Sequence, residues 1–371
     1  MPSKTNNLRR QVGIDALNAI CPYYTMYPLR FPLDFLVKHG SQGQWVLDPF
    51  CGRGTTNFAA RLCGINSLGA DSSPVAVAIA SAKLASTSYK EVVALAAQIL
   101  KEEKEAALPE GEFWTLAYER SVLSQICKLR QALLRRCNDD ASTVLRALVL
   151  GSLHGPINKK THSYFSNQCP RTFAPKPAYA VKFWRRKKLF PPTINVLDVI
   201  SRRASNYLQY RLPRVKGRVE QLDSRKQHFG TARFSSVITS PPYYGMRTYV
   251  PDQWLRNWFV GGEPEVAYGQ REGDMEHTNP DAFASQLRQV WKSAYEAAVP
   301  SATLVCRFGG IRDRNAEPLE IIKESLKGSG WSMLTLRSAG DANKGKRQAH
   351  QFGSRVATSP RREYDIYARR S

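Results

Sequence analysis

Short apolar runs alternate with helix-like segments in the N-terminal part of the chain. The run QWVLDPF at 44–50 predicts a buried strand that ends in an acid and a proline, and INSLGAD at 65–71 predicts a second strand that also ends in an acid. Between them, residues 51–64 show a tight glycine turn followed by a helical pattern, and Ser73 begins a further helix. This β-α-β-α order is typical of a parallel, doubly wound sheet.

The middle of the chain has a different pattern. Residues 89–150 are rich in Ala, Leu, Glu, Lys and Arg at helical spacing, with few strand signals, and they predict two or three helices. The next segment, 154–192, is punctuated by proline and predicts a loop-like region, and residues 193–210 look helical again. The middle of the chain is therefore expected to interrupt the sheet.

Strand patterns return in the last part of the chain. Strands are predicted at 218–223, 234–240, 301–309, 331–337 and 363–369, and helices at 251–259, 280–298 and 315–327. With the two early strands, they predict an α/β protein with a doubly wound, mostly parallel seven-stranded sheet. The expected division is a first half of the core at 1–88, a helical and basic insertion at 89–212 and the second half of the core at 213–371.

Basic residues outnumber acidic ones by a wide margin. The chain has 54 Lys and Arg against 31 Asp and Glu, a net charge of +23, while 42% of its residues are hydrophobic and can form a core. From Pro156 to Pro192 there are nine Lys and Arg, no acid and several interleaved aromatic residues. This pattern favours a polyanionic partner, most simply nucleic acid, although a solvated surface remains the alternative for each basic cluster. The candidate contacts are Lys159, Lys160, Arg171, Lys176, Arg185, Arg186, Lys344 and Arg347.

Several classes of protein are not expected. No apolar run approaches the ~18 residues of a membrane span, and the N-terminal segment lacks the apolar core of a signal peptide. The seven cysteines are far apart and form no CxxC pair, so neither a zinc site nor a disulfide framework is expected. These features predict a cytoplasmic protein without a metal.

The sequence DPFCGRGTT, at 48–56, places two glycines between a strand and a helix. Gly52 and Gly54 allow the backbone to approach a ligand closely, and Asp71, at the end of the next strand, is placed to accept hydrogen bonds from ribose hydroxyls. The third glycine of the dinucleotide-binding fingerprint is absent, which disfavours a nicotinamide dehydrogenase. A tight turn without a ligand remains the alternative for this loop taken alone.

The sequence Ser240-Pro241-Pro242-Tyr243 directly follows the strand VITS. Two prolines stiffen the backbone and remove two N–H donors, which leaves neighbouring carbonyls free to accept hydrogen bonds. A serine, free carbonyls and the flat face of a projecting tyrosine suit a planar heterocycle that carries an amino group. Taken alone, the motif is better explained by an ordinary proline turn with a packing tyrosine.

Together these motifs resemble those of the S-adenosylmethionine-dependent amino-methyltransferases of DNA, in which DPFxGxGTT is the cofactor loop and (S/D/N)PPY the catalytic loop. The likeness covers both sheet-forming blocks and extends to Phe31-Pro32 and to the basic segment YFSNQCPRTFAPKPAYAVKFW. It implies a methyltransferase sheet and S-adenosyl-L-methionine as cofactor. It assigns cofactor binding to Phe31, Pro32, Asp48, Pro49, Phe50, Gly52, Gly54, Thr55, Thr56, Asp71, Ser72 and Asp223, and catalysis to Ser240, Pro241, Pro242 and Tyr243.

The resemblance also implies a substrate and a mechanism. SPPY is more usual in enzymes that methylate cytosine N4, and DPPY in those that methylate adenine N6, so a site-specific cytosine-N4 enzyme acting on a base flipped out of duplex DNA is favoured. Such an enzyme is of the restriction-modification or orphan type, and the former implies a cognate restriction endonuclease that cuts the same site. The carbonyl of Pro241 and the hydroxyl of Ser240 would accept the two N–H bonds of the amino group.

Three alternatives remain beside the cytosine-N4 interpretation: an adenine-N6 DNA methyltransferase, an RNA base methyltransferase, and a nucleic-acid-binding protein on a degenerate methyltransferase scaffold. The recognised sequence and the oligomeric state are not indicated. One departure from the family pattern puts Asp223 in doubt, because about 150 residues separate its strand from that of Asp71 where a compact member has only a helix. The interpretation requires that the glycine loop and the SPPY loop meet in space.

Overall fold

The computed structural model describes residues 16–23, 27–158, 161–245, 251–268, 275–311, 317–341 and 360–371. The chain divides into two compact units that alternate along the sequence. The helical unit comprises Met1–Tyr24, Ser81–Leu212 and Tyr249–Gly269, and the sheet unit comprises Thr25–Ala80, Pro213–Thr248 and Gln270–Ser371.

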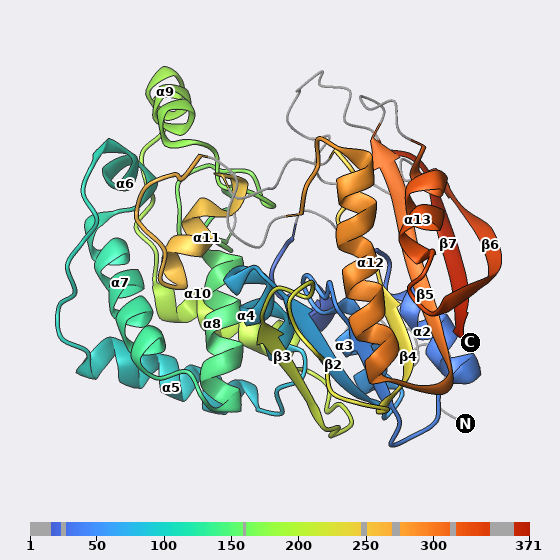
Figure 1. Ribbon diagram of the computed structural model, residues 1–371. Coiled ribbons are helices and arrows are strands. Elements are labelled where there is room, and N and C mark those ends of the chain that lie inside the picture. Colours follow the sequence, from blue (N-terminus) through green and yellow to red (C-terminus); the bar gives the residue numbers. More distant parts are fainter. Residues whose placement is uncertain are drawn as a thin grey trace. The chain divides into compact units, whose positions relative to one another are not determined.

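The sheet unit is built on one seven-stranded sheet with the order β3-β2-β1-β4-β5-β7-β6 (Figure 1). Its strands are β1 (Trp45–Asp48), β2 (Asn66–Asp71), β3 (Gly217–Gln221), β4 (Phe234–Thr239), β5 (Ala298–Ile311), β6 (Trp331–Asp341) and β7 (Pro360–Arg370). All neighbouring strands are parallel except that β7 is antiparallel to both β5 and β6. The prediction of an α/β fold with a mostly parallel seven-stranded sheet is confirmed.

Helices cover both faces of this sheet. They are α2 (Arg30–His39) and α3 (Thr55–Leu62) on one face, and α12 (Pro280–Ala297) and α13 (Pro318–Leu326) on the other. Adjacent strand residues face opposite ways: Val46 and Ile238 pack with α2 and α3, whereas Leu47 and Val237 join the core that contains α12 and α13. Because both faces of the sheet are buried, the central strands are continuous apolar runs in the sequence. Helices on both faces make the sheet doubly wound.

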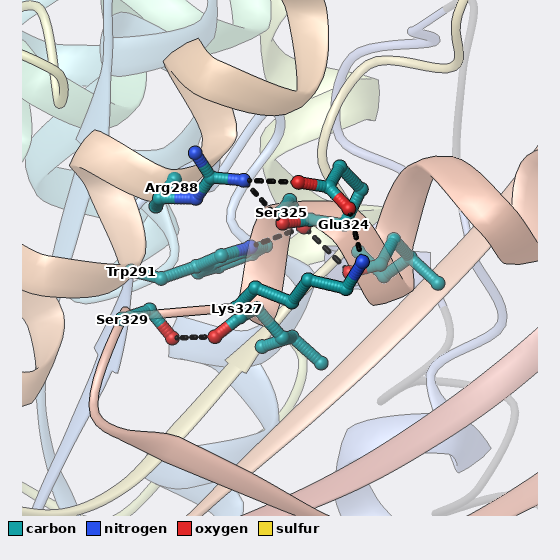
Figure 2. A network of polar contacts seen from close by, with 8 residues as sticks. Arg288, Trp291, Glu324, Ser325, Lys327 and Ser329 are labelled. Atoms are coloured by element: carbon teal, nitrogen blue, oxygen red, sulfur yellow. Dashed lines mark hydrogen bonds and ion pairs between the residues drawn. The ribbon is translucent and has the colours of Figure 1, made fainter. Parts of the chain in front are cut away.

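Polar contacts hold α12 and α13 together (Figure 2). The indole N–H of Trp291 donates to Ser325 Oγ at 2.9 Å inside the core. At the rim, Arg288 donates to both the carbonyl and the carboxylate of Glu324, at 2.6 and 2.8 Å, and Lys327 pairs with the same carboxylate at 2.6 Å. Because the buried indole N–H has a partner, the large Trp291 side chain can pack under the sheet without a desolvation penalty.

The helical unit contains more helices than predicted in its first part. Residues 89–152 form α5 (Tyr89–Glu102), α6 (Glu112–Ala117), α7 (Arg120–Arg135) and α8 (Asp140–Ser152), four helices instead of two or three. The additional element is α6, which is too short for a periodic signal. Two of the four helices begin with capping boxes, Ser88 with Glu91 for α5 and Asp139 with Ser142 for α8.

The prediction of a loop-like region at 154–192 is wrong in its second half, which contains α9 (Pro177–Lys187). Pro177 occupies the first turn, where a missing N–H costs nothing, so the proline starts the helix instead of breaking it. Trp184 is buried and donates its indole N–H to the Gln168 carbonyl at 2.7 Å. The unit is completed by α10 (Val196–Tyr207), η1 (Pro251–Gln253) and α11 (Trp254–Phe259).

Candidate active site

The glycine loop leaves β1 at the carboxyl edge of the sheet. Gly52 has φ +49° and Gly54 has φ +74°, both in the left-handed region that favours glycine. The N–H of Gly52 donates to Asp71 Oδ2 at 2.9 Å, which ties the loop to the end of the neighbouring strand β2. No side chain caps α3, which begins directly after Gly54. The loop, the start of a helix and the Asp71 carboxylate thus lie together.

Gly54 also has a packing role. The helix α4 (Pro74–Ala82) contacts the loop at Ala80, and a Cβ built on Gly54 would lie 2.7 Å from the Ala80 Cβ and 2.8 Å from its Cα. These separations are well inside van der Waals contact. The contact with Ala80 therefore requires glycine at this position, independently of any ligand.

A buried network of oxygen atoms surrounds Asp48, the last residue of β1. Asp48 is fully buried, and its carboxyl oxygens lie within hydrogen-bond distance of the hydroxyls of Tyr27, at 2.8 Å, and Thr239, at 2.6 Å. The Tyr27 hydroxyl also lies 2.5 Å from Thr56 Oγ1, which donates to the carbonyl of Ile238 at 3.2 Å. The network joins β1, α3, the end of β4 and the segment before α2.

The protons of this network can be counted. The three contacts from Asp48 through Tyr27 and Thr56 to the Ile238 carbonyl have only two hydroxyl protons between them. A protonated Asp48 supplies the third proton and satisfies every contact. Burial, the largest influence, raises the pKa of Asp48 despite the hydroxyls that stabilise its charge. The proton count favours a proton on the carboxyl group of Asp48, and burial acts in the same direction.

The SPPY loop follows β4, which pairs directly with β1 in parallel. Thr239, the residue before Ser240, bonds Asp48, and Thr56 of the glycine loop bonds the Ile238 carbonyl. The glycine loop and the SPPY loop therefore leave adjacent strands at the same edge of the sheet, and two hydrogen bonds join the DPFCGRGTT segment to the last two residues of β4, directly before SPPY.

Tyr243 does not project freely as expected for SPPY. Its side chain is nearly buried, with the residue 9% exposed, and its ring packs edge-on against Phe308 of β5 with centroids 5.7 Å apart. Its hydroxyl donates to Glu363 Oε1 of β7 at 2.7 Å. In the same loop Ser240 is half-buried, Pro241 is buried and Pro242 is exposed.

The carboxyl group of Asp71 has a raised pKa. Burial raises its pKa to about 6, against the opposing effect of the N–H groups of Ser73 and Gly52, each of which donates to one carboxylate oxygen at 2.9 Å. Each oxygen retains a further acceptor site. The carboxylate is therefore both anchored and able to accept hydrogen bonds from a ligand.

Asp223 lies close to Asp71 in spite of the long insertion between them. β3 pairs with β2, and the N–H of Leu222 donates to the Asp71 carbonyl at 3.1 Å. The Asp223 carboxylate is engaged by the guanidinium of Arg225 at 2.7 and 2.8 Å. Burial alone would raise the pKa of Asp223, but its hydrogen bonds with Arg225 hold it below the usual value. Asp223 thus follows a strand that is adjacent to the strand of Asp71, and its charge is paired with that of Arg225.

The segment that carries Phe31 is fixed over this region by aromatic contacts. The buried Phe31 ring packs edge-on against Tyr27, with centroids 5.4 Å apart. The guanidinium of Arg307 lies 4.2 Å from the Phe31 centroid and donates two hydrogen bonds to Asp365. These contacts connect the Phe31 segment, through Tyr27, with Asp48 and the glycine loop.

The other predicted cofactor residues have varied surroundings. Pro32, Pro49 and Thr55 are buried, Phe50 is half-buried and Ser72 is exposed. The carbonyl of Pro49 accepts from Ser224 Oγ at 2.6 Å, and the Phe50 ring packs edge-on against Trp291. Pro32, Pro49 and Thr55 thus shape the backbone, whereas Ser72 is open to solvent.

The basic candidates of the helical unit are exposed. Arg171 and Lys176 precede α9, and the ammonium of Lys176 lies 5.1 Å from the centroid of the Tyr268 ring. Arg185 pairs with Glu112 of α6, and Arg186 is exposed beside it. The candidates Lys159, Lys160, Lys344 and Arg347 lie outside the described residues.

The irregular segment before α9 is held by buried polar side chains. Arg256 of α11 is 1% exposed and donates to the carbonyls of Thr172 at 2.8 Å and of Leu150 and Arg171 at 3.2 Å. His154 is also buried, and its Nδ1 lies 2.9 Å from the Pro170 carbonyl; burial, the largest influence, lowers its pKa well below the usual value. A neutral His154 then donates from Nδ1, and the segment that presents Arg171 is rigidly supported.

Three residues of the site were missed by sequence reasoning: Tyr27, Thr239 and Glu363. Tyr27 stands one helical turn before Phe31, and Thr239 immediately precedes SPPY, so position offered a weak signal for both. Nothing in the sequence connects Glu363 with Tyr243. Within the described ranges, no group of three or more His, Cys, Asp or Glu is arranged to hold a metal. None of the helices there has the length and apolarity needed to cross a bilayer.

Comparison with known families gives one match. Residues 4–82, which include the glycine loop and Asp71, match the N6/N4 methyltransferase family model, described as DNA methylase. No curated protein matches the sequence. The family match covers only the first sheet-forming block, and it supports a methyltransferase.

Among solved structures, the chain is similar to several methyltransferases. A TehB-like SAM-dependent methyltransferase from Corynebacterium glutamicum aligns over 99% of this chain and 97% of its own, with 6% identity and a TM-score of 0.35. The rRNA methyltransferase aviRa from Streptomyces viridochromogenes aligns over 94% and 87%, with 12% identity and a TM-score of 0.33. A geranyl diphosphate methyltransferase, solved with geranyl diphosphate and sinefungin, aligns over 92% and 78%, with 8% identity and a TM-score of 0.36. These values are too low to assign a relationship.

Proposed function

We propose that this chain is an S-adenosyl-L-methionine-dependent DNA methyltransferase that acts on the exocyclic amino group of a base, with cytosine N4 as the favoured acceptor. One observation carries the proposal. The glycine loop and the SPPY loop leave the adjacent strands β1 and β4 at the same edge, where Thr239 donates to Asp48 and Thr56 donates to the Ile238 carbonyl. In open α/β sheets this edge is where ligands bind. The DNA methylase match to residues 4–82 supports the same reaction class.

The glycine loop suits the cofactor in part. Asp71 is anchored by two N–H groups and retains acceptor sites for ribose hydroxyls, and the neighbouring Ser72 is exposed. The close contact with Ala80 already explains why residue 54 is glycine, so Gly54 is not evidence for a bound ligand. Bound here, S-adenosyl-L-methionine supplies a methyl group on a sulfonium that is already activated for transfer, and the protein has mainly to position the acceptor.

The SPPY loop would position the acceptor amino group. The Ser240 hydroxyl and the Pro241 carbonyl accept its two N–H bonds, which favours a pyramidal nitrogen whose lone pair points at the methyl group. The half-buried Ser240 is open enough to receive a ligand, and the nearly buried Tyr243 ring forms a fixed wall instead of a mobile plate. Contact of a base with such a ring is worth ~1–3 kcal/mol, which offsets part of the few kcal/mol needed to extrude the base from a duplex.

The basic face of the helical unit is proposed to bind the DNA backbone. On α9, Lys182 and Arg186 are exposed on the same side as Tyr179, which is 66% exposed, and Phe190 follows the helix at 76% exposed. Cations would neutralise phosphates, and exposed aromatic rings would stack on bases or sugars. Arg171 and Lys176 extend the same basic run toward the N-terminal side of the helix.

Nucleoside analysis of methylated DNA tests the proposal. DNA from cells that express the protein, compared with DNA from cells with an empty vector, is digested and analysed by mass spectrometry, and N4-methylcytosine is expected. N6-methyladenine in its place would move the assignment to adenine, and transfer to tRNA but not to duplex DNA would refute a DNA substrate. Tyr243→Ala should keep cofactor binding and lose transfer, and normal transfer by this variant would count against the base-pocket role.

A further inference from the structure

Glu363 is a buried carboxylate beside the candidate catalytic loop, and neither its position in the sequence nor the family resemblance assigns it a role. It is 7% exposed and accepts the Tyr243 hydroxyl at 2.7 Å. The two residues are 120 positions apart in the chain, so the contact is made by the fold and not by local sequence. Burying a carboxylate is unfavourable unless it is hydrogen-bonded, and the phenol supplies a bond of this kind.

The neighbouring strands explain how Tyr243 reaches Glu363. In the register of the sheet, Glu363 is paired with Gly309 of β5 on one side and with Gly340 of β6 on the other. Neither glycine contributes a side chain next to the carboxylate. The next residue, Tyr244, forms a parallel bridge with Gly310 of β5. The SPPY loop therefore runs beside β5 at the point where Gly309 leaves room for the phenol.

Two contacts fix the Tyr243 ring in different ways. The edge-on contact with Phe308, at an interplanar angle of 76°, limits where the ring lies. The hydrogen bond to Glu363 fixes the position of the hydroxyl at the far end of the ring, and so limits the swing of the whole ring about the Cα–Cβ bond. Removal of the hydrogen bond should leave the ring packed but free to shift. A displacement of about 1 Å in a positioning group costs up to about 100-fold in rate.

We propose that Glu363 is a positioning residue for the transfer reaction: it holds the Tyr243 ring in the orientation in which the ring borders the target base. This inference rests on the proposed function. Glu363 acts through Tyr243 and takes no proton from the substrate. Glutamine at this position keeps a carbonyl oxygen that accepts the phenol, whereas alanine does not.

Four variants test this role: Glu363→Gln, Glu363→Ala, Tyr243→Phe, and the Tyr243→Phe/Glu363→Ala double variant. Transfer of a tritiated methyl group from S-adenosyl-L-methionine to unmethylated plasmid DNA gives kcat and the KM of the cofactor. Glu363→Ala and Tyr243→Phe should each lower kcat by up to about 100-fold with the cofactor KM unchanged. The double variant should be no slower than the slower single variant, and Glu363→Gln should restore a near wild-type rate.

The controls separate this role from folding and from the proposed function. Glu320→Ala removes an exposed carboxylate of α13 that pairs with Lys323, and it should leave kcat unchanged. If Glu363→Ala does not fold, the rates of the conservative Tyr243→Phe and Glu363→Gln variants test the positioning role. Wild-type rates in Tyr243→Phe, additive losses in the double variant, or a Glu363→Gln variant as slow as alanine would overturn the positioning role with the function intact. Absence of transfer by the wild-type protein would refute the proposed function and this role with it.

Discussion

Replacement of Gly54 by alanine should destabilise the sheet unit through two separate effects. The backbone at Gly54 has φ +74°, which costs an L-residue about 1–2 kcal/mol. The added Cβ would also lie 2.7 Å from the Ala80 Cβ and 2.8 Å from the Ala80 Cα, and overpacking of this kind costs about 1–3 kcal/mol. The free energy of unfolding should therefore fall by about 2–5 kcal/mol, a large share of the 5–15 kcal/mol typical of a native protein.

Gly43 offers a matched control for this variant. Its φ is +83°, close to that of Gly54, but a Cβ built on it meets nothing within 4 Å. Gly43→Ala should therefore carry only the backbone cost of about 1–2 kcal/mol. Urea unfolding of both variants, followed by circular dichroism, gives the packing cost as their difference. Ala80→Gly should restore only part of this cost in Gly54→Ala, because the Ala80 Cα remains at 2.8 Å.

The result also distinguishes two explanations of Gly54. If the glycine is present only to let a ligand approach, Gly54→Ala should be as stable as Gly43→Ala and should lose cofactor affinity alone. Equal unfolding free energies for the two variants would refute the packing argument.

Three further predictions follow from the charges of the two units. Burial raises the pKa of Asp71 to about 6, so folding disfavours its ionised form, and the contribution of Asp71 to stability falls as the pH rises from about 4 to 6. Because the ionised carboxylate is the form that accepts hydrogen bonds from the cofactor, cofactor affinity measured by calorimetry should rise about 5- to 10-fold between pH 5 and 7. This rise should be absent in Asp71→Asn. Asp48→Asn imitates the neutral acid and should change the unfolding free energy by no more than about 1 kcal/mol at pH 7, and a loss of several kcal/mol in urea unfolding would show that Asp48 is ionised. Arg186→Ala should weaken DNA binding and reduce the slope of log K against log salt concentration by about 1. Arg185→Ala should weaken binding less, because the charge of Arg185 is paired with Glu112. Equal losses of affinity in the two variants, measured by fluorescence anisotropy, would contradict this.

The strands and the loops at their ends were predictable from local pattern. Buried strands need apolar residues on both faces, and Val46-Leu47 and Val237-Ile238 satisfy this within a few positions. Parallel strands present their carboxyl ends at one edge, so residues after two such strands are expected near each other. The proximity of the glycine loop and the SPPY loop follows from this geometry, because β1 and β4 are neighbours.

The polar partners of the loops were not predictable in the same way. Thr239 bonds Asp48 across 191 positions of the chain, and Tyr243 bonds Glu363 across 120. A threonine at a strand end and a glutamate at the start of another have no local feature that distinguishes them from other polar residues. Their roles depend on strand order and register, which a single sequence does not contain.

The segment before α9 shows a different limit. Prolines and a high charge made residues 154–192 look like an open loop, yet Arg256 and His154 bind three of its carbonyls from within the core of the helical unit. Arginine is rarely buried without a carboxylate, so Arg256 was not expected to be inside. Here carbonyl oxygens take the place of an acid. A buried arginine of this kind holds irregular backbone in one conformation.

The insertion in the sheet unit explains how distant residues come to serve one edge. The largest segment of the helical unit, Ser81–Leu212, separates β2 from β3 along the sequence, and the chain returns to the sheet unit at Pro213. β3 then pairs with β2 so that Asp71 is opposite Gln221, two residues before Asp223. The entropy of closing a loop grows only with the logarithm of its length, so an insertion that folds by itself can replace a short crossover at small cost. The separation of Asp71 from Asp223 along the chain is therefore compatible with an intact carboxyl edge of the sheet.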